Sequence, residues 1–201
     1  MIPVIVLAAA YLIGAIPFGY LLVRLKSGKD VRTAGSGNIG ATNVLRTSGR
    51  ALGVLTLVLD IGKGALAVWI ADRVTGGSPL WMSATALAVM AGHAYPIFLG
   101  FRGGKAVATC AGAFLYLTPL PMLLTLVVFV VIVAITRYIS MGSVIAAGCF
   151  PLAVFLVEHP PTPVLVSSIV AGAFVVFRHR SNVRRIREGN ENVFSFGGRR
   201  S

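Results

Sequence analysis

Residues 2–23 read IPVIVLAAAYLIGAIPFGYLLV, and this run contains no charged side chain. A helix that crosses the apolar core of a bilayer needs about 20 consecutive apolar residues, so the run is long enough to span a membrane. No basic segment precedes it, and we therefore expect it to be retained rather than cleaved as a signal peptide.

Further apolar runs follow along the chain. Residues 51–71, 80–98 and 139–157 meet the same length criterion, and residues 119–136 and 162–177 fall slightly short of it. Residues 106–118 would form a helix of only about 20 Å, which is either a short span or one arm of a re-entrant hairpin with 119–136. We predict an all-α, polytopic membrane helix bundle that forms a single domain over residues 1–201. It has seven spans, or five spans and a re-entrant hairpin.

The composition agrees with this class. Apolar residues make up 56% of the chain and charged residues 12%, whereas soluble domains carry roughly 25% charged residues. The mean hydropathy is +0.86. These values exclude a disordered chain, a disulfide scaffold and most soluble enzymes.

The basic residues predict which side of the membrane each loop faces. The net charge is +12, and the lysines and arginines gather in residues 24–50 and 99–105, at Arg137, and in the tail from Arg178. The positive-inside rule then places the amino terminus outside and the tail in the cytoplasm of a bacterial cell, with the protein in the inner membrane. Attraction to anionic lipid is the alternative explanation of this charge. We expect no nucleic-acid partner, because no recognisable reading module accompanies the basic segments.

Three polar clusters fall on the predicted cytoplasmic side. The first reads GSGNIGATN over residues 35–43 and is followed by Arg46. Its glycines would let successive backbone N–H groups converge on an anion, and the guanidinium of Arg46 suits a phosphate. An ordinary polar turn is the alternative. The Walker pattern GxxxxGK[ST] is absent.

The second cluster reads GHAYP over residues 92–96 and GFRGGK over residues 100–105. Lys105 opens the following helix, where backbone N–H groups and the helix dipole favour an anion. His93 is either a packing histidine or part of the site. The third cluster begins at Arg178 and holds His179 and Asn182, which are i, i+3 neighbours on a helix and so face the same ligand. A basic, lipid-binding helix is its alternative.

Two further polar positions have more than one interpretation each. Asp60 and Lys63 are i, i+3 within a span, where charged groups are costly, and they form either a self-neutralising pair or a source of positive charge under a phosphate. Ser143 lies near a helix start, where it caps that helix, packs within it or touches phosphate. We expect no metal and no cofactor, because the six carboxylates and three histidines do not converge in a ligand pattern. Neither H-x-x-x-x-D nor GxSxG occurs.

Together the three clusters resemble the motifs of the bacterial acylphosphate–glycerol-3-phosphate acyltransferases, the PlsY family. The matching patterns are GSGN-x-G-x-TN-x-x-R at 35–46, GH-x-x-P followed by F-x-GGK-x-VAT at 92–109, and HR-x-N-x-x-R-x-x-x-G-x-E at 179–191. In one departure, Ala106 stands where the family usually has a glycine. The extra methyl group either restricts the approach of the donor phosphate or is harmless, since alanine suits a helix.

The resemblance implies transfer of a fatty acyl chain from acyl phosphate to the 1-hydroxyl of glycerol 3-phosphate, at the membrane and with no obligate protein partner. It implies that four residues are catalytic, namely Ser36, Lys105, His179 and Asn182. It implies that substrate and phosphate are bound or oriented by Gly35, Gly37, Asn38, Thr42, Asn43, Arg46, Lys63, His93, Gly103, Gly104, Thr109, Ser143 and Arg185.

An acyl phosphate is an activated anhydride, so we favour direct attack by the glycerol hydroxyl, with Ser36 as a nucleophile in the alternative. The proton acceptor is a substrate phosphate oxygen, or else His93 or His179. Two rival functions are a carrier of a phosphorylated metabolite and a lipid-binding scaffold. Polar clusters confined to one side argue against a carrier, whose site usually lies near the midplane between repeats.

Overall fold

The computed structural model describes residues 2–194, with side chains from Val4 onward, and all regular structure in that range is helical. The chain divides into two compact units, Met1–Leu117 and Thr118–Ser201. Unit 1 contains α1 (Ile2–Ala15), α2 (Phe18–Ser27), η1 (Val31–Thr33), α3 (Ala41–Ser48), α4 (Arg50–Thr75), α5 (Pro79–Ala94), η2 (Ile97–Leu99) and α6 (Val107–Leu117). Unit 2 contains α7 (Pro119–Thr136), α8 (Ile139–Glu158), α9 (Thr162–Arg178) and α10 (Arg180–Arg187).

The first predicted span is broken near its carboxyl end. Pro17 has no N–H to donate and disfavours helical dihedral angles at Ile16, so α1 ends at Ala15 and α2 begins at Phe18. The predicted span over 2–23 is therefore present as two helices joined at Ile16 and Pro17, within the candidate span Val4–Ser27. The α2 helix ends at Ser27, where Gly28 adopts a left-handed φ of 67° and its N–H caps the carbonyl of Arg24.

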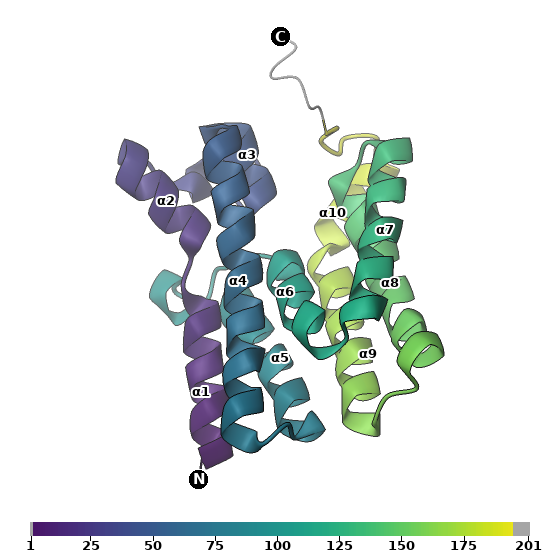
Figure 1. Cartoon of the computed structure of the whole chain (residues 1–201). Coiled ribbons are helices and arrows are strands. Elements are labelled where there is room, and N and C mark those ends of the chain that lie inside the picture. The colour runs from purple at the N-terminus through teal and green to yellow at the C-terminus, as the bar shows by residue number, and fades with distance from the viewer. Residues whose placement is uncertain (1, 195–201) are drawn as a thin grey trace. The chain divides into compact units, whose positions relative to one another are not determined.

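Helix α4 is the centre of unit 1, and α1, α3, α5 and α6 all pack on it (Figure 1). Glycines bring α4 and α6 into direct backbone contact. A Cβ on Gly64 would collide with the carbonyl of Thr109, and one on Gly112 would collide with the carbonyl of Ile61. Small residues at helix contacts are what membrane bundles use for close packing.

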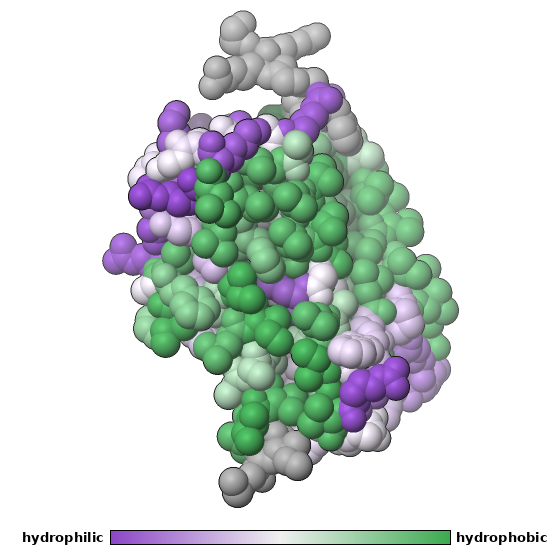
Figure 2. Space-filling model, turned by 60° about the vertical axis from the view of Figure 1, so that its left-hand side comes forward, coloured by the Kyte–Doolittle hydropathy of each residue, from purple (hydrophilic) through white to green (hydrophobic). Residues whose placement is uncertain are grey.

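The outer faces of the helices are apolar. Val58, Val130 and Ile135 are large hydrophobic side chains that lie more than half exposed. Figure 2 shows that hydrophobic residues predominate on the surface that faces the viewer. Large exposed apolar side chains on helices of both units match a surface solvated by lipid.

Within residues 2–194, five segments are long and apolar enough to cross a membrane, and a sixth is obtained if α9 and α10, which meet at a bend of 50°, are counted as one. The five are Val4–Ser27, Arg50–Thr75, Pro79–Leu99, Pro119–Thr136 and Ile139–Glu158. The segment predicted at 106–118 forms only the 11-residue α6, about 16 Å long. An integral membrane bundle is confirmed, and seven full spans are not.

Candidate functional site

The first motif lies in a loop that a small apolar core holds against α2 and α3. Val23 of α2, Val31 of η1, Ile39 of the loop and Val44 of α3 are almost fully buried and pack together. At the start of η1, the Asp30 carboxylate accepts from the backbone N–H and the guanidinium of Arg32. These hydrogen bonds hold the pKa of Asp30 below its usual value, despite the opposing effect of burial.

Asn43 organises the loop from the inside. Its side chain is buried, and Nδ2 donates to the carbonyls of Val31 (3.2 Å), Ala34 (3.1 Å) and Asn38 (2.8 Å), while Oδ1 accepts from the N–H of Ser36 (2.9 Å). One amide therefore joins both ends of the motif. The sequence motif suggested that Asn43 contacts substrate, and the structure shows its amide occupied within the protein.

Two glycines of this loop allow the turn that the sequence suggested, but the backbone N–H groups do not form the expected anion-binding nest. Gly35 and Gly37 adopt left-handed φ values of 59° and 69°. The N–H groups of Ser36, Gly37 and Gly40 donate within the loop, to Asn43 Oδ1, the Ala34 carbonyl and Asn38 Oδ1. Since these three donors are already used, anion binding at this motif falls mainly to side chains.

Those side chains point outward. Ser36 and Arg46 are exposed, and Asn38 and Thr42 are half-buried. Within the part of the chain that the structure describes, Arg46 forms no ion pair and the amide nitrogen of Asn38 makes no hydrogen bond. An uncompensated guanidinium beside amide and hydroxyl donors is well suited to a phosphate.

The second motif is a turn built on the end of α5. The N–H of Gly103 donates to the carbonyl of Ala94 (3.2 Å), and the N–H of Gly104 donates to that of His93 (3.1 Å). A Cβ on Gly104 would collide with the His93 ring, so glycine is required for this close approach. Lys105 follows directly, two residues before the start of α6.

Ala106 does not belong to the helix that follows. It is fully buried and adopts a φ of 60°, a left-handed conformation that costs an alanine roughly 1–2 kcal/mol. The expectation that alanine is harmless here because it suits a helix is therefore wrong: α6 begins only at Val107, and position 106 favours a glycine.

A cluster of buried polar groups lies beneath the second motif, where α4, α5 and α6 meet. Lys63 Nζ lies 2.7 Å from Asp60 Oδ1 and donates to the carbonyl of Ile16 (2.9 Å). His93 Nδ1 lies 3.2 Å from Thr109 Oγ1 and 3.6 Å from Asp60 Oδ1. All four polar side chains are at most 4% exposed. For Asp60 and Lys63 this geometry favours the self-neutralising pair over a phosphate contact.

The third motif lies in unit 2, at the junction of α9 and α10. His179 is the residue at the bend, and its ring nitrogen Nδ1 lies 2.7 Å from the carbonyl of Val175. Because that carbonyl only accepts, Nδ1 carries a proton, and in the neutral ring Nε2 is an acceptor. Asn182 lies one turn further on, with its N–H donating to the His179 carbonyl. Both side chains are buried, as expected for residues on a common face.

Glu191 binds the polar residues of this motif together. Its carboxylate accepts from Asn182 Nδ2 (2.7 Å), Ser140 Oγ (2.9 Å) and Arg185 Nε (2.8 Å). Burial acts to raise the pKa of Glu191, but the hydrogen bonds from Asn182, Ser140 and Arg185 outweigh it and hold the pKa below its usual value. The positive charge of Arg185 is thus compensated within the protein.

Ser143 does not cap a helix, and its surroundings agree with the helix-packing interpretation. It is buried in the second turn of α8, whose N-cap is Tyr138, and its hydroxyl donates to the carbonyl of Ile139 (2.9 Å).

The structure thus groups the sequence-predicted residues within each unit. Unit 1 holds the first two motifs and the buried cluster, and unit 2 holds the third motif and Ser143. Sequence reasoning gave no role to Glu191 or Ser140 and did not connect Asp60 with His93. Glu191 could have been suspected, because it is one of only three acidic residues in the basic segments.

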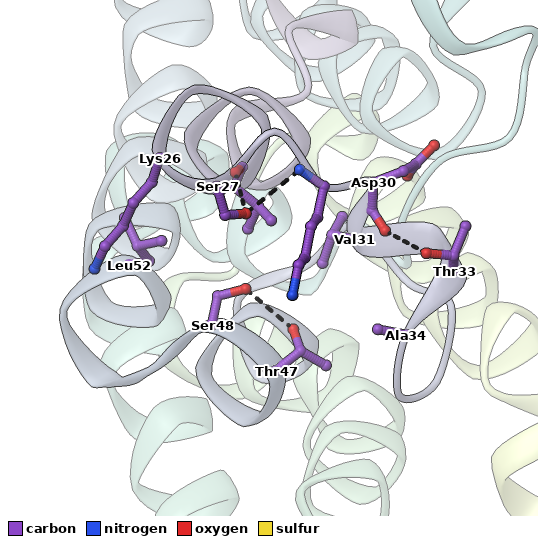
Figure 3. A pocket seen from close by; sticks show the side chains of 11 residues that line it. Lys26, Ser27, Asp30, Val31, Thr33, Ala34, Thr47, Ser48 and Leu52 are labelled. Atoms are coloured by element: carbon purple, nitrogen blue, oxygen red, sulfur yellow. Dashed lines mark hydrogen bonds between the residues drawn. The ribbon is translucent and has the colours of Figure 1, made fainter.

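A hollow of about 550 Å³ opens in unit 1 between α2, η1, α3 and α4 (Figure 3). Hydroxyl groups of Ser27, Thr33, Thr47 and Ser48 line it together with Lys26, and each hydroxyl makes a hydrogen bond within the protein. None of the residues predicted for the site lines this hollow, although Val31, Ala34 and Thr47 of its lining are hydrogen-bonded to Asn43.

Comparison with known proteins gives one consistent result. A family model described as glycerol-3-phosphate acyltransferase matches residues 4–189. A glycerol-3-phosphate acyltransferase of Geobacter sulfurreducens is 51% identical over 190 residues, which cover 94% of this chain and 96% of the relative. That of Geotalea daltonii is 47% identical over 191 residues, covering 95% and 97%.

Solved structures agree. The crystal structure of PlsY (YgiH), an integral membrane glycerol 3-phosphate acyltransferase in its glycerol 3-phosphate form, has a TM-score of 0.90 and 39% identity over 96% of each chain. Its lysophosphatidic acid form has a TM-score of 0.86 and 38% identity, covering 96% of this chain and 95% of that one. The chain therefore belongs to the glycerol-3-phosphate acyltransferase family.

Proposed function

We propose that this protein transfers a fatty acyl chain from acyl phosphate to the 1-hydroxyl of glycerol 3-phosphate, releasing lysophosphatidic acid and inorganic phosphate. The observation that carries the proposal is the match over 96% of both chains to an enzyme solved in its glycerol 3-phosphate form. The two phosphate-suited segments of unit 1, with Arg46 and Lys105, support it. Both substrates carry phosphate, and cations offset that charge.

The reaction needs little from the protein beyond binding and charge stabilisation. The glycerol oxygen attacks the acyl carbonyl, the bond from that carbon to the phosphate oxygen breaks, and phosphate leaves. We assign to Lys105 the stabilisation of the charge that develops on the oxygens. The third motif, through its resemblance to the family pattern, gives His179 and Asn182 the same proposed role. No acyl-enzyme is required, and Ser36 serves as a hydrogen-bond donor to phosphate.

The proton of the attacking hydroxyl passes to a phosphate oxygen of a substrate, whose second pKa is near 6. The surroundings of His93 support this assignment over a His93 base, because the ring is buried, with Nδ1 facing Asp60 and Thr109 and its opposite edge against Gly104. His179 holds Nδ1 on a backbone carbonyl, which leaves Nε2 as an acceptor, so His179 is the competing base. The pH–rate profile separates the two cases. If a substrate phosphate accepts the proton, the acidic limb of the profile persists in His93→Gln and His179→Gln even where their turnover is reduced, whereas loss of that limb in one variant would favour that histidine as the base.

Binding roles follow from exposure. We assign phosphate contacts to Ser36, Asn38, Thr42 and Arg46, and a supporting role to Asn43. We assign to His93 and Thr109 the role of holding the second motif in place, and to Arg185 and Glu191 the same role in the third motif.

The 201 residues act as one acyltransferase domain in the bacterial inner membrane. We propose seven membrane segments in all, of which α6 is a partial one. The amino terminus lies outside, and the tail and all three motifs face the cytoplasm. The basic residues near the motifs support this orientation.

The experiment that tests the function offers three donors to purified protein in lipid nanodiscs with glycerol 3-phosphate: palmitoyl phosphate, palmitoyl-CoA and palmitoyl acyl carrier protein. The expected result is lysophosphatidic acid from palmitoyl phosphate alone, lost in Lys105→Ala. Lys26→Ala is the matched control, since it removes the same charge at a residue outside the three motifs and should leave turnover unchanged. Equal or faster turnover with a thioester donor would contradict the proposed donor.

A further inference from the structure

The buried carboxylate of Asp60 has no part in the reaction described above. It is 2% exposed in the middle of α4, and Lys63 and His93 both approach the same oxygen, Oδ1, at 2.7 Å and 3.6 Å. Among the described residues, Oδ1 makes no hydrogen bond of good geometry, so charge is what holds these groups together. A buried charge is costly, and it is usually paired or functional.

Lys63 accounts for only part of the arrangement. Its ammonium donates to the carbonyl of Ile16, just before the break between α1 and α2, and lies 5.5 Å from the centre of the Phe18 ring. The ion pair therefore anchors the broken first span to α4. A pair that served only this purpose would not need a histidine from α5 beside it.

The position of Asp60 fixes the proton on the His93 ring. Nδ1 lies between the carboxylate and the hydroxyl of Thr109. A lone pair on Nδ1 would face a negative charge, whereas an N–H there is attracted by it. Lys63 already neutralises the carboxylate, so the ring does not need a second proton. The neutral ring with a proton on Nδ1 results, and Nε2 carries the lone pair.

The Nε2 edge of the ring supports the glycine turn. A Cβ on Gly104 would collide with Nε2, and the N–H groups of Gly103 and Gly104 are bonded to the carbonyls of Ala94 and His93. The residue before Lys105 thus lies directly against the imidazole. The orientation and charge distribution of that ring determine where the turn sits.

We infer that Asp60 is a positioning residue: by orienting His93, it sets the Gly103–Gly104 turn and so places the ammonium of Lys105. The inference deepens the proposed function and depends on it for the role of Lys105. In Asp60→Asn the proton can move to Nε2, where an N–H would point at Gly104 and displace the turn. A displacement of about 1 Å near reacting groups can lower the rate on the order of a hundredfold.

The test combines turnover with the ¹⁵N NMR signature of the imidazoles. Wild-type protein in nanodiscs should show His93 with its proton on Nδ1, its signals assigned with His159→Gln and His179→Gln. Asp60→Asn should change this signature and lower kcat at least tenfold. Asp72→Asn is the matched control: it removes another carboxylate of α4, which accepts from the Tyr116 hydroxyl, and should change neither.

The double variant Asp60→Asn, Lys63→Met separates positioning from neutralisation. If Asp60 serves only to compensate Lys63, the double variant recovers wild-type turnover, and the inference is overturned. If it positions His93, the double variant keeps both the altered signature and the low kcat. A wild-type proton on Nε2, or an Asp60→Asn variant with an altered signature and turnover within threefold of wild type, also overturns it.

Two further outcomes concern the folding of the variant and the activity of the wild-type protein. If Asp60→Asn does not fold, the wild-type signature alone still decides whether the carboxylate sets the proton position. If wild-type protein has no acyltransferase activity, the proposed function fails, whereas the link between Asp60 and His93 still stands or falls on the NMR signature.

Discussion

Replacing Asn43 should open the first motif without unfolding the helices. Asn43→Ala removes four hydrogen bonds that tie the loop together, three donated by Nδ2 and one accepted from Ser36. At a net value of about 1 kcal/mol each, the upper limit is about 4 kcal/mol. Water reaches some of the released groups, so a loss of about 2–3 kcal/mol is expected, which corresponds to roughly a 30- to 150-fold change in the loop-opening equilibrium.

Hydrogen exchange at the backbone N–H of Ser36 measures this change most directly. In wild-type protein that N–H is bonded to Asn43 Oδ1, so its exchange should accelerate about 30- to 150-fold in Asn43→Ala, and kcat/KM for glycerol 3-phosphate should fall. Thr47→Val is the control, because it removes only the Thr47 hydroxyl of the same helix, which bonds the Asn43 carbonyl and Ser48, and leaves the Asn43 amide in place. It should change exchange at Ser36 less than tenfold.

Asn43→Asp provides the sharper comparison. The substitution keeps the shape and the acceptor for Ser36, but it turns a carboxylate oxygen toward the carbonyls of Val31, Ala34 and Asn38. It should therefore damage the loop at least as much as Asn43→Ala. Wild-type activity in Asn43→Asp, or unchanged exchange at Ser36 in Asn43→Ala, would refute the reasoning.

Three further predictions concern single contacts. The pKa of Glu191 is depressed in the folded protein, so the ionised carboxylate stabilises the fold at any pH above its ordinary pKa of 4.5. This stabilisation is lost as the pH falls through the depressed pKa, and the melting temperature should fall with it. In Glu191→Gln this fall of the melting temperature at low pH should be smaller. Ala106→Gly relieves left-handed strain while losing a buried methyl group worth about 0.8 kcal/mol, so the melting temperature should hold or rise, whereas Ala106→Val should lower it clearly. Gly112→Val places a side chain against the carbonyl of Ile61 and should destabilise the α4–α6 contact by about 1–3 kcal/mol, measured by detergent-induced unfolding; an unchanged midpoint would show that the helices separate freely.

The helices were predictable because each follows from a simple local rule. Apolar runs of spanning length gave α4, α5 and α8 to within a few residues. Where the structure departs from the prediction, a single residue explains the difference. Pro17 divides the first run into α1 and α2, and α6 starts one residue later than predicted because Ala106 takes a left-handed conformation.

The sequence predicted which polar residues make up the candidate site, but not which of them bind substrate and which bind other protein groups. Asn43, Lys63 and Ser143 belong to the polar clusters or spans that the sequence singled out, yet each uses its polar group inside the protein. A sequence shows which groups can bind phosphate. It does not show which of these groups are already bonded to a carbonyl or carboxylate of the protein. Those partners come from other elements, such as Ile16 for Lys63, and only packing determines them.

Glu191 illustrates the same limit from the other direction. Its partners Ser140 and Asn182 lie 51 and 9 residues away, and no periodicity links these positions. In contrast, the pairing of Asp60 with Lys63 follows from helical spacing and was recognisable in advance.

The most direct test of the central claim follows both products of a single reaction. Purified protein in nanodiscs with chelator, palmitoyl phosphate and glycerol 3-phosphate should form inorganic phosphate and lysophosphatidic acid at equal rates, and Lys105→Ala should form neither. Phosphate released without lysophosphatidic acid would mean hydrolysis and a wrong acceptor. Folded protein that binds glycerol 3-phosphate and forms neither product would contradict the acyltransferase and favour a carrier of phosphorylated metabolites.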